Sequence, residues 1–328
     1  MKLSNKSILL TGGAGFIGSH VAAALVRIGA NVTVVDNLST GQAANLHPVA
    51  AQVAFHPLDI RTPSFIDFVI DGRFDVIVHL AANAYIPPAV ENPDYDYHVN
   101  LHAPFRLFDA LRRSKQRPVI LVSSSAAVYG NPAHYPVAED APTLPVSPYG
   151  VSKLGMERYL AVYSQLYEFR AASMRLFSVY GPRQRKQIVY DLIAKLCDNP
   201  HRLQILGDGT QIRDLIYVED VARAAICILA NAPLRGEVYN VAGGVGSSTR
   251  QVAEAICRAM RLTPEFAFTG SIRPGDSEKW VADIGRLRSL GFSPGVALDE
   301  GICRTVAWYY LAHHIDQNEP RQVLPHFQ

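Results

Sequence analysis

The chain has 328 residues, of which 48% are hydrophobic and 18% are charged, and its formal net charge is +2. This length allows one large domain or two coupled domains with a sizeable core, and the small net charge gives no reason to expect nucleic-acid binding. The sequence shows neither the apolar stretch of a signal peptide nor a span long enough to cross a membrane, so we expect a cytosolic protein without membrane contact.

The first half of the chain alternates short apolar runs with helical patterns. Helical periodicity is expected near residues 16–28, 63–70, 94–114 and 149–169. Strands are expected at residues 7–10, 31–36, 53–55, 75–80 and 118–123, and they are rich in Val, Ile and Leu without polar alternation. Such strands are buried on both faces, so we predict an α/β fold with a Rossmann-type, doubly wound parallel sheet.

The pattern loosens after residues 171–177, where short strands and helices follow a loop at 180–185. We predict a first domain over residues 1–177, to which residues 215–245 return. A smaller, interleaved C-terminal domain should take up most of residues 178–328. There is no clean linker between the two.

A glycine-rich turn follows the first predicted strand. Gly12, Gly15 and Gly18 are spaced G-x-x-G-x-x-G in the segment TGGAGFIG, just before a helical pattern. Residues without side chains let backbone N–H groups approach a pyrophosphate at the positive end of a helix. Asp36 ends the next strand, where its carboxylate can accept both hydroxyls of an adenosine ribose and repel a 2′-phosphate, so the sequence predicts NAD rather than NADP.

Tyr149 and Lys153 are four residues apart and should share one face of a helix. A phenol is a poor base at neutral pH, but a neighbouring ammonium ion and a nicotinamide cation favour the phenolate. Lowering its pKa from about 10 to about 7 needs roughly 4 kcal/mol. Alone, the pair could be an ordinary surface pair; together with the glycine turn and the serine run Ser123–Ser125, it indicates a catalytic base beside a nicotinamide.

These ordered motifs resemble those of the extended short-chain dehydrogenase/reductase family, the nucleotide-sugar epimerases and dehydratases. The likeness covers nearly the whole chain. The matching segments are residues 11–20, 36–41, 59–60, 79–82, 100, 123–130, 147–153, 179–182, 207–214 and 273–276.

The resemblance implies a complete NAD site in which Asp59 and Ile60 flank the adenine and Asn100 lies near the dinucleotide. The expected cofactor-binding residues are Gly12, Gly15, Phe16, Ile17, Gly18, Asp36, Asn37, Asp59, Ile60, Leu80, Ala81, Ala82, Asn100, Ser123, Tyr149 and Lys153. It also implies the catalytic roles. Tyr149 removes a proton from a sugar hydroxyl, Lys153 lowers the pKa of Tyr149 and binds the nicotinamide ribose, and Ser125 bonds the reacting oxygen.

The residues after Ser125 favour one reaction within the family. Dehydratases of the family carry Asp and Glu where this chain has Ala126 and Ala127, and alanine cannot move protons. The dialanine resembles the 4-epimerases, so we predict a nucleotide-sugar 4-epimerase working through a transient 4-keto sugar. Other 4-keto-forming chemistry (dehydratase, decarboxylase or reductase) and a non-catalytic NAD-binding scaffold are the alternatives.

The substrate-binding residues implied by the resemblance are Ser178, Arg185, Arg213, Arg273, Asp276 and Trp280. The two arginines Arg213 and Arg273 match positions that contact the nucleotide diphosphate, and Asp276 would orient Arg273, contact the ribose or form a structural ion pair. A bulky Trp280 favours UDP-glucose and UDP-galactose over N-acetyl sugars. Ser178 with Arg185 resembles instead the glucuronate 4-epimerases.

Three further expectations concern metals, cysteines and assembly. The histidines lack ligand spacing, so we predict no metal site. The cysteines are widely spaced and without a C-x-x-C pair, so we expect reduced core residues at Cys197, Cys227, Cys257 and Cys303. Relatives in the family dimerise through helices that correspond to the regions around 101–111 and 154–166, so we expect a homodimer.

Overall fold

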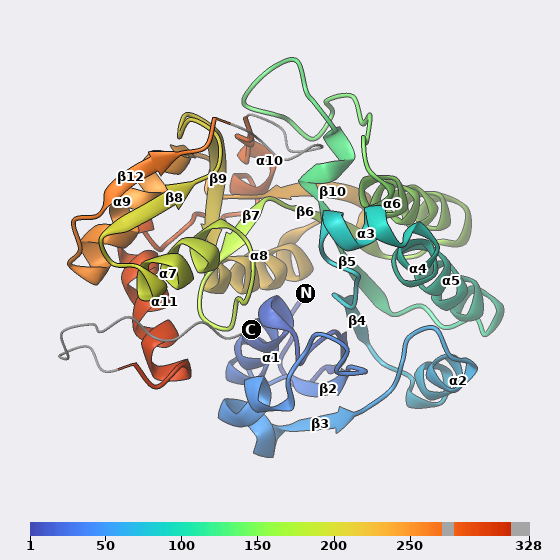
Figure 1. Ribbon diagram of the computed structural model, residues 1–328. Coiled ribbons are helices and arrows are strands. Elements are labelled where there is room, and N and C mark those ends of the chain that lie inside the picture. Colours follow the sequence, from blue (N-terminus) through green and yellow to red (C-terminus); the bar gives the residue numbers. More distant parts are fainter. Residues whose placement is uncertain (271–278, 316–328) are drawn as a thin grey trace.

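A seven-stranded sheet forms the centre of the computed structural model, which describes residues 1–270 and 279–315. Its order is β10-β6-β5-β4-β1-β2-β3, and all neighbouring strands run parallel (Figure 1). The strands are β1 (Ser7–Thr11), β2 (Asn31–Val35), β3 (Val53–His56), β4 (Val76–His79), β5 (Val119–Ser125), β6 (Ala171–Leu176) and β10 (Arg235–Val241). This confirms the predicted doubly wound sheet, whose order reverses between β1 and β4.

Helices cover both faces of this sheet, as the continuous apolar strands predicted. Ile8 and Leu10 of β1 belong to the core cluster of one face, and Leu9 belongs to that of the other, because successive strand residues point to opposite sides. The first face is packed by α1 (Phe16–Arg27), α8 (Val218–Asn231) and the 3-10 segment η1 (Ala43–Gln52). The second is packed by α2 (Pro63–Gly72), α5 (Ala103–Arg113) and α6 (Pro148–Tyr167).

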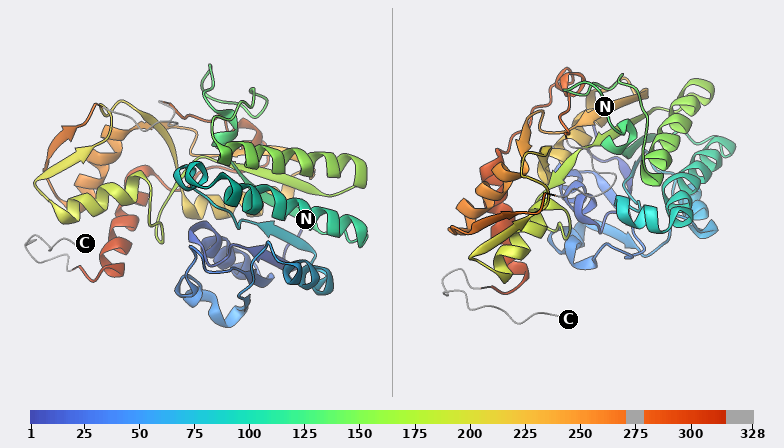
Figure 2. Two further views of the ribbon diagram at one scale, coloured as in Figure 1. Left: turned by 45° about the vertical axis from the view of Figure 1, so that its right-hand side comes forward. Right: turned by 45° about the horizontal axis from the view of Figure 1, so that its top comes forward.

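The second part of the chain builds a smaller region beside the sheet (Figure 2). One small sheet has the order β11-β9-β7, and β12 pairs with β8 in another. These strands are β7 (Ser178–Tyr180), β8 (Arg202–Ile205), β9 (Ile212–Tyr217), β11 (Gly246–Ser248) and β12 (Glu265–Phe268). The helices α7 (Ile188–Asp198), α9 (Thr249–Met260) and α11 (Leu298–Ala312) share a core with them, and the short α10 (Gly285–Arg288) follows at the side of β10.

The expected division into two domains stays a prediction, but the placement of α8 and β10 agrees with a return of the chain to the large sheet. Helix α8 packs against α1, and β10 pairs with β6. Strand β9, which contains residue 215, pairs with β7 and β11 in the smaller sheet, while its Ile216 belongs to the core cluster of the large sheet.

The helix expected over residues 94–114 is interrupted. Short α3 (Ile86–Glu91) and α4 (Pro93–Tyr97) precede a π-helical turn, η2 (His98–His102), and only then does α5 begin. Pro93 and Pro104, which lack a backbone N–H, lie at the starts of α4 and α5 and explain part of this segmentation. The π turn places Asn100 in its middle.

The cysteine prediction is partly wrong. None of the four cysteines forms a disulfide, and Cys197 and Cys257 are buried, but Cys227 is only partly buried and Cys303 is exposed, because it lies on the outer side of α11. Among residues 1–270 and 279–315, no three His, Cys, Asp or Glu side chains are grouped to hold a metal ion. Within the same ranges, no helix has the length and apolar character needed to cross a membrane.

Candidate active site

A cleft of about 1060 Å³ lies between the large sheet and the smaller region. Single-ligand pockets usually measure about 300–1,000 Å³, so this one has room for a dinucleotide and a second ligand. It is lined by most of the residues that the sequence indicated: Gly12, Gly15, Phe16, Ile17, Gly18, Asp36, Asn37, Asp59, Ile60, Leu80, Ala81, Ala82, Ser123, Ser125, Tyr149, Lys153, Ser178, Arg185, Arg213 and Trp280. Asn100 is not part of the lining, and Arg273 and Asp276 lie outside the described residues.

The glycine turn forms the floor of one end of the cleft, between β1 and α1. Gly12 has φ +70°, and a Cβ added there would lie 2.6 Å from the backbone N of Ala81 at the end of β4. A Cβ on Gly18 would collide with the carbonyl oxygen of Gly12. Gly15 caps α1 and would meet only that same oxygen, at 3.2 Å. The turn therefore requires glycine for its own packing, and it exposes the start of α1 to the cleft.

Asp36 is held at the end of β2 by main-chain donors. Its Oδ2 accepts from Ala14 N at 3.0 Å, and its Oδ1 accepts from Leu38 N at 2.8 Å. Burial raises the pKa of the Asp36 carboxyl above its usual value, although the two backbone hydrogen bonds act to lower it. Each carboxylate oxygen retains acceptor capacity toward the cleft, which suits the two hydroxyls of a ribose.

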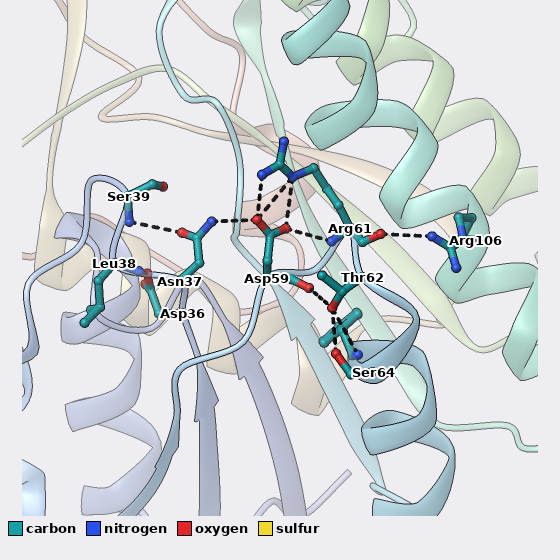
Figure 3. A network of polar contacts seen from close by, with 10 residues as sticks. Asp36, Asn37, Leu38, Ser39, Asp59, Arg61, Thr62, Ser64 and Arg106 are labelled. Carbon is teal, nitrogen blue, oxygen red and sulfur yellow. Dashed lines mark hydrogen bonds and ion pairs between the residues drawn. The ribbon is translucent and has the colours of Figure 1, made fainter.

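A polar network continues this wall from Asn37 to Arg61 (Figure 3). Asn37 Nδ2 donates to Asp59 Oδ2 at 3.1 Å, and Arg61 Nη2 donates to the same oxygen at 2.6 Å. The Arg61 guanidinium lowers the pKa of Asp59 to about 2. Arg61 also lies 5.0 Å over the Tyr95 ring, and both residues line the cleft, although the sequence patterns did not indicate either of them.

The catalytic candidates lie where β5 and α6 meet. Ser147 caps α6 by accepting from Gly150 N at 3.2 Å, and Pro148 occupies the first turn, so the helix begins directly before Tyr149. Lys153 Nζ lies 5.9 Å from the centre of the Tyr149 ring and donates to the Ser123 carbonyl at 2.8 Å. The Ser125 hydroxyl accepts from Ala127 N at 3.2 Å, and its influence lowers the pKa of the Tyr149 phenol.

The pKa values of this pair show what the protein groups contribute in the absence of the cofactor's charge. Burial raises the pKa of Tyr149 to about 12, with the Ser125 hydrogen bond acting in the opposite direction and the Asp96 carboxylate adding to the rise. Burial lowers the pKa of Lys153 to about 8, opposed by the carboxylates of Asp96 and Glu157. The expected fall of the Tyr149 pKa toward neutrality does not arise from the protein groups alone, because the ammonium is not in direct contact with the phenol and is itself disfavoured by burial.

Asn100 lies behind the cleft, in the π-helical turn. Its Oδ1 accepts from Asn83 N at 3.1 Å, and its Nδ2 donates to Asp96 Oδ1 at 2.6 Å. It therefore holds the loop after Leu80–Ala82 in place, and its expected position near the dinucleotide stays a prediction. No sequence pattern indicated Asp96, because Tyr149 and Lys153, whose pKa values it affects, are distant in the chain.

The other end of the cleft is built largely by a loop between β7 and α7. Residues 181–187 bring Arg185 and Lys186 to the cleft, with positive φ at Arg183 (74°) and Gln187 (73°). Lys186 Nζ lies 4.9 Å over the ring of Tyr85, which comes from the first domain, and burial lowers the pKa of Lys186. The sequence did not indicate Lys186 or Tyr85.

Trp280 and Arg213 lie near each other at this end. The Trp280 ring stands edge-on to Phe177 with centroids 6.0 Å apart, and its backbone N donates to Ile212 O at 3.0 Å. Arg213 Nη1 donates to the same carbonyl at 3.0 Å. Trp280 is partly buried, so it contributes to a core cluster and also limits the cleft.

The residues of the first end fit NAD. The glycine turn leaves no room for side chains beside the N-terminus of α1, as a pyrophosphate site requires, and Asp36 offers a carboxylate for the adenosine ribose. Lys153, Ser125 and Tyr149 stand at the ends of β5 and α6 in the same cleft. They are therefore placed to act on a group bound next to the nicotinamide end.

Comparison with known proteins agrees with this reading. UDP-glucose 4-epimerase of Mycolicibacterium smegmatis is 36% identical over 308 residues, which cover 92% of this chain and 97% of that protein. The structure of Thermus thermophilus UDP-glucose 4-epimerase in complex with NAD superposes with a TM-score of 0.82 at 34% identity, over 92% of this chain and 98% of that one.

A third similarity points to a different sugar. UDP-N-acetylglucosamine 4-epimerase from Methanobrevibacter ruminantium, in complex with UDP-N-acetylmuramic acid, has a TM-score of 0.87 at 31% identity, covering 94% of this chain and 99% of that one. Residues 8–242 match the NAD dependent epimerase/dehydratase family. With an NAD-shaped glycine turn and a Tyr149–Lys153 pair in one cleft, the chain belongs to the NAD-dependent epimerase/dehydratase family.

Proposed function

We propose that the protein is a nucleotide-sugar 4-epimerase that interconverts UDP-glucose and UDP-galactose through a transient 4-keto sugar. The observation that carries this proposal is the group of Ser125, Tyr149 and Lys153 in the cleft, with two alanines directly beside it. The activity would be that of an isomerase, because the cofactor returns to its starting state in each cycle.

In this mechanism Tyr149 accepts the proton of the C4 hydroxyl and later returns it to the new alcohol. Ser125, which lines the same cleft as Tyr149, donates to the C4 oxygen, and Lys153 holds its ammonium beside them. NAD, when bound, supplies reversible hydride acceptance at C4. Because burial raises the pKa of Tyr149, a further positive charge near the phenol is needed to form the phenolate at neutral pH.

Ala126 and Ala127 favour epimerisation over dehydration. Both lie buried in the turn η3 (Ala126–Tyr129) and line the cleft next to Ser125. Loss of water from a sugar needs a second acid–base pair near C5 and C6, and methyl groups cannot supply it. Tyr149 is the group that we assign to proton transfer at the reacting centre, and it is sufficient for chemistry at C4.

The identity of the sugar is the more specific part of the proposal. Trp280 narrows the substrate end and favours a small C2 hydroxyl, in line with the glucose 4-epimerases among the relatives. Ser178 and Arg185 line the same end and support the second candidate, UDP-glucuronate, whose carboxylate would suit the guanidinium. We place Arg213 at the nucleotide diphosphate.

The test is incubation with UDP-glucose, then UDP-glucuronate and UDP-N-acetylglucosamine, with product NMR and absorbance at the wavelength of the reduced cofactor. We expect UDP-galactose from UDP-glucose at the highest rate. Conversion of UDP-glucuronate alone would replace the first substrate by the second. If no epimer forms and no UDP-sugar reduces the bound cofactor, the protein is a scaffold rather than an enzyme.

We also propose a homodimer formed through α5 and α6, the helices over the regions around 101–111 and 154–166. Apolar side chains lie exposed along α6, among them Val151, Tyr159, Val162 and Leu166, the last of which is 66% exposed. Such a stripe on a regular helix is typical of an interface. Small-angle scattering should give a mass about twice 36.0 kDa, and a monomer mass would contradict the proposal.

A further inference from the structure

Asp96 is a carboxylate in the interior of the protein that the mechanism above does not use. It lies on α4, is 0% exposed, and α4 packs against α6, the helix that carries Tyr149 and Lys153. A buried carboxylate is costly unless other groups compensate its charge. The groups around Asp96 therefore indicate which residues its charge influences.

One carboxylate oxygen of Asp96 is bonded and the other is not. Its Oδ1 accepts from Asn100 Nδ2 at 2.6 Å and from Asn83 Nδ2 at 3.4 Å. Its Oδ2 is buried and has no hydrogen-bond partner among the described residues. In residues 1–270 and 279–315, Asp96 also takes part in no direct ion pair. Its charge is thus left to act over a distance.

Glu157 makes an instructive contrast, since it also lies near Lys153. Its carboxylate is taken up by Arg175, with Nη2 at 2.8 Å and Nε at 3.0 Å. Both carboxylates raise the pKa of Lys153 against burial, and Asp96 does so more strongly. The same charge on Asp96 raises the pKa of Tyr149. Of the two acids, Asp96 is the one without a cation of its own.

We propose that Asp96 is a positioning residue that sets the charge state of the catalytic pair: its carboxylate keeps Lys153 an ammonium ion inside the protein, while it restrains ionisation of Tyr149. The proposal rests on the assignment of Tyr149 and Lys153 as that pair. Asn100, in the π-helical turn η2, donates to the Asp96 carboxylate and accepts from Asn83 N. It therefore links Asp96 to the loop at Asn83. Turns of this kind are rare and occur mostly at functional sites.

The other titratable groups near the pair do not replace Asp96. On β4, burial and the charge of Lys153 lower the pKa of His79 to about 3, so His79 stays neutral. Arg175 on β6 is held by Glu157. On the outer side of α4 and η2, Asp94 and His98 face solvent with 3.6 Å between their charged atoms, and Glu91 of α3 is exposed.

Removing the negative charge of Asp96 should lower the pKa of Tyr149 and the pKa of Lys153. Without a nearby anion, the phenolate of Tyr149 is less disfavoured and the ammonium of Lys153 is less stabilised, so both pKa values fall. For a charge beyond contact distance, a shift of about one pH unit is expected. Both limbs of the pH profile of kcat/KM therefore move toward lower pH in Asp96→Asn.

The decisive measurement is an NMR titration of NAD-loaded protein carrying tyrosine labelled with ¹³C at Cζ, in which the Tyr149 signal is assigned by its loss in Tyr149→Phe. Asp96→Asn should lower the pKa of Tyr149 by about one unit. Asp94→Asn is the matched control on the same helix, because its side chain is 86% exposed, and should leave that pKa unchanged. An unchanged titration in Asp96→Asn would overturn the proposal.

Further variants distinguish the proposed role of Asp96 from a role in stability alone, and the titration distinguishes it from the proposed function. If Asp96→Asn does not fold, Asp96→Ser removes the charge but leaves an acceptor for Asn100 and should give the same shift, whereas Asp96→Glu should retain the profile of the unmodified protein. A uniform loss of activity without movement of either limb would show a merely structural role. The titration needs no turnover, so it decides the role of Asp96 even if no UDP-sugar is converted.

Discussion

The two ends of the cleft are built on different principles. At the cofactor end, strand ends and main-chain groups set the geometry: Gly12 lies against the backbone of Ala81, and Asp36 is held by two backbone N–H groups. At the substrate end, long side chains such as Arg185 and Lys186 extend from a loop between β7 and α7. The backbone of the fold therefore shapes the cofactor end, whereas exchangeable side chains line the end that we propose binds the substrate.

Strain is distributed unequally between the two ends. Gly12 adopts its positive φ at little cost, because glycine lacks a Cβ. Arg183 and Gln187 adopt positive φ with full side chains, which costs about 1 kcal/mol or more each. The substrate loop therefore depends on its packing against the rest of the protein, and variation there should change specificity before it changes the fold.

Replacement of Tyr149 by Phe acts at the junction of the two ends and should have the largest effect. The ring remains but the proton acceptor is lost, so we expect kcat to fall by about 10³-fold or more while NAD affinity stays unchanged. Steady-state turnover and NAD fluorescence titration measure the two. Tyr159→Phe, on the exposed side of the same helix, should keep full activity. Full activity in Tyr149→Phe would refute the mechanism.

Gly12→Ala tests whether the backbone governs the cofactor end. A Cβ at this position meets Ala81 N at 2.6 Å, so the turn must shift, and we expect NAD affinity to drop by about 100-fold with a clear loss of thermal stability. Gly291→Ala is the matched control: its φ is also positive (89°), but no atom lies within 4 Å of an added Cβ. Equal losses in both variants would mean that backbone strain alone, not the contact with β4, explains the effect.

Arg185→Ala tests whether side chains govern the substrate end. We expect KM for the preferred UDP-sugar to rise by about 10-fold with NAD affinity unchanged, since one charge-assisted contact contributes about 1.5–3 kcal/mol at most. A larger rise for UDP-glucuronate than for UDP-glucose would indicate the carboxylate site. The exposed Arg170, away from the cleft, provides the control variant Arg170→Ala. A fall in NAD affinity instead would show that the two ends are not independent.

The smallest effect is expected from Asp59→Asn in the polar network from Asn37 to Arg61 at the cofactor end. Arg61 lowers the folded-state pKa of Asp59 to about 2, so the pair contributes stability above the ordinary carboxyl pKa of 3.8 and loses it as the pH falls through about 2. Because Arg61 is partly exposed, the contribution is about 0.5–1 kcal/mol, or a Tm difference of about 1–2 °C at pH 6. The two melting curves should converge near pH 2. Asp67→Asn, exposed on α2, serves as the control, and a pH-independent difference would disprove the ion-pair explanation.

The cofactor end could be predicted because its signals are local. The glycine spacing, the following helix and Asp36 lie within one βαβ unit of the chain, and the apolar strands alone indicate a parallel sheet. The prediction was wrong at Cys303, which is exposed rather than part of the core. This error concerns the direction in which a side chain points, which short sequence patterns determine poorly.

The sequence by itself determined the doubly wound sheet, the dinucleotide turn and the one-sided Tyr149–Lys153 pair, because each depends on residues that are neighbours along the chain or one helical turn apart. Only the tertiary structure decided that Asp96 acts on Lys153 and that Lys186 lies over Tyr85. It also decided that the protein groups alone leave the Tyr149 pKa raised. Burial and electrostatic coupling depend on which distant segments pack together, and that information exists only in the folded chain.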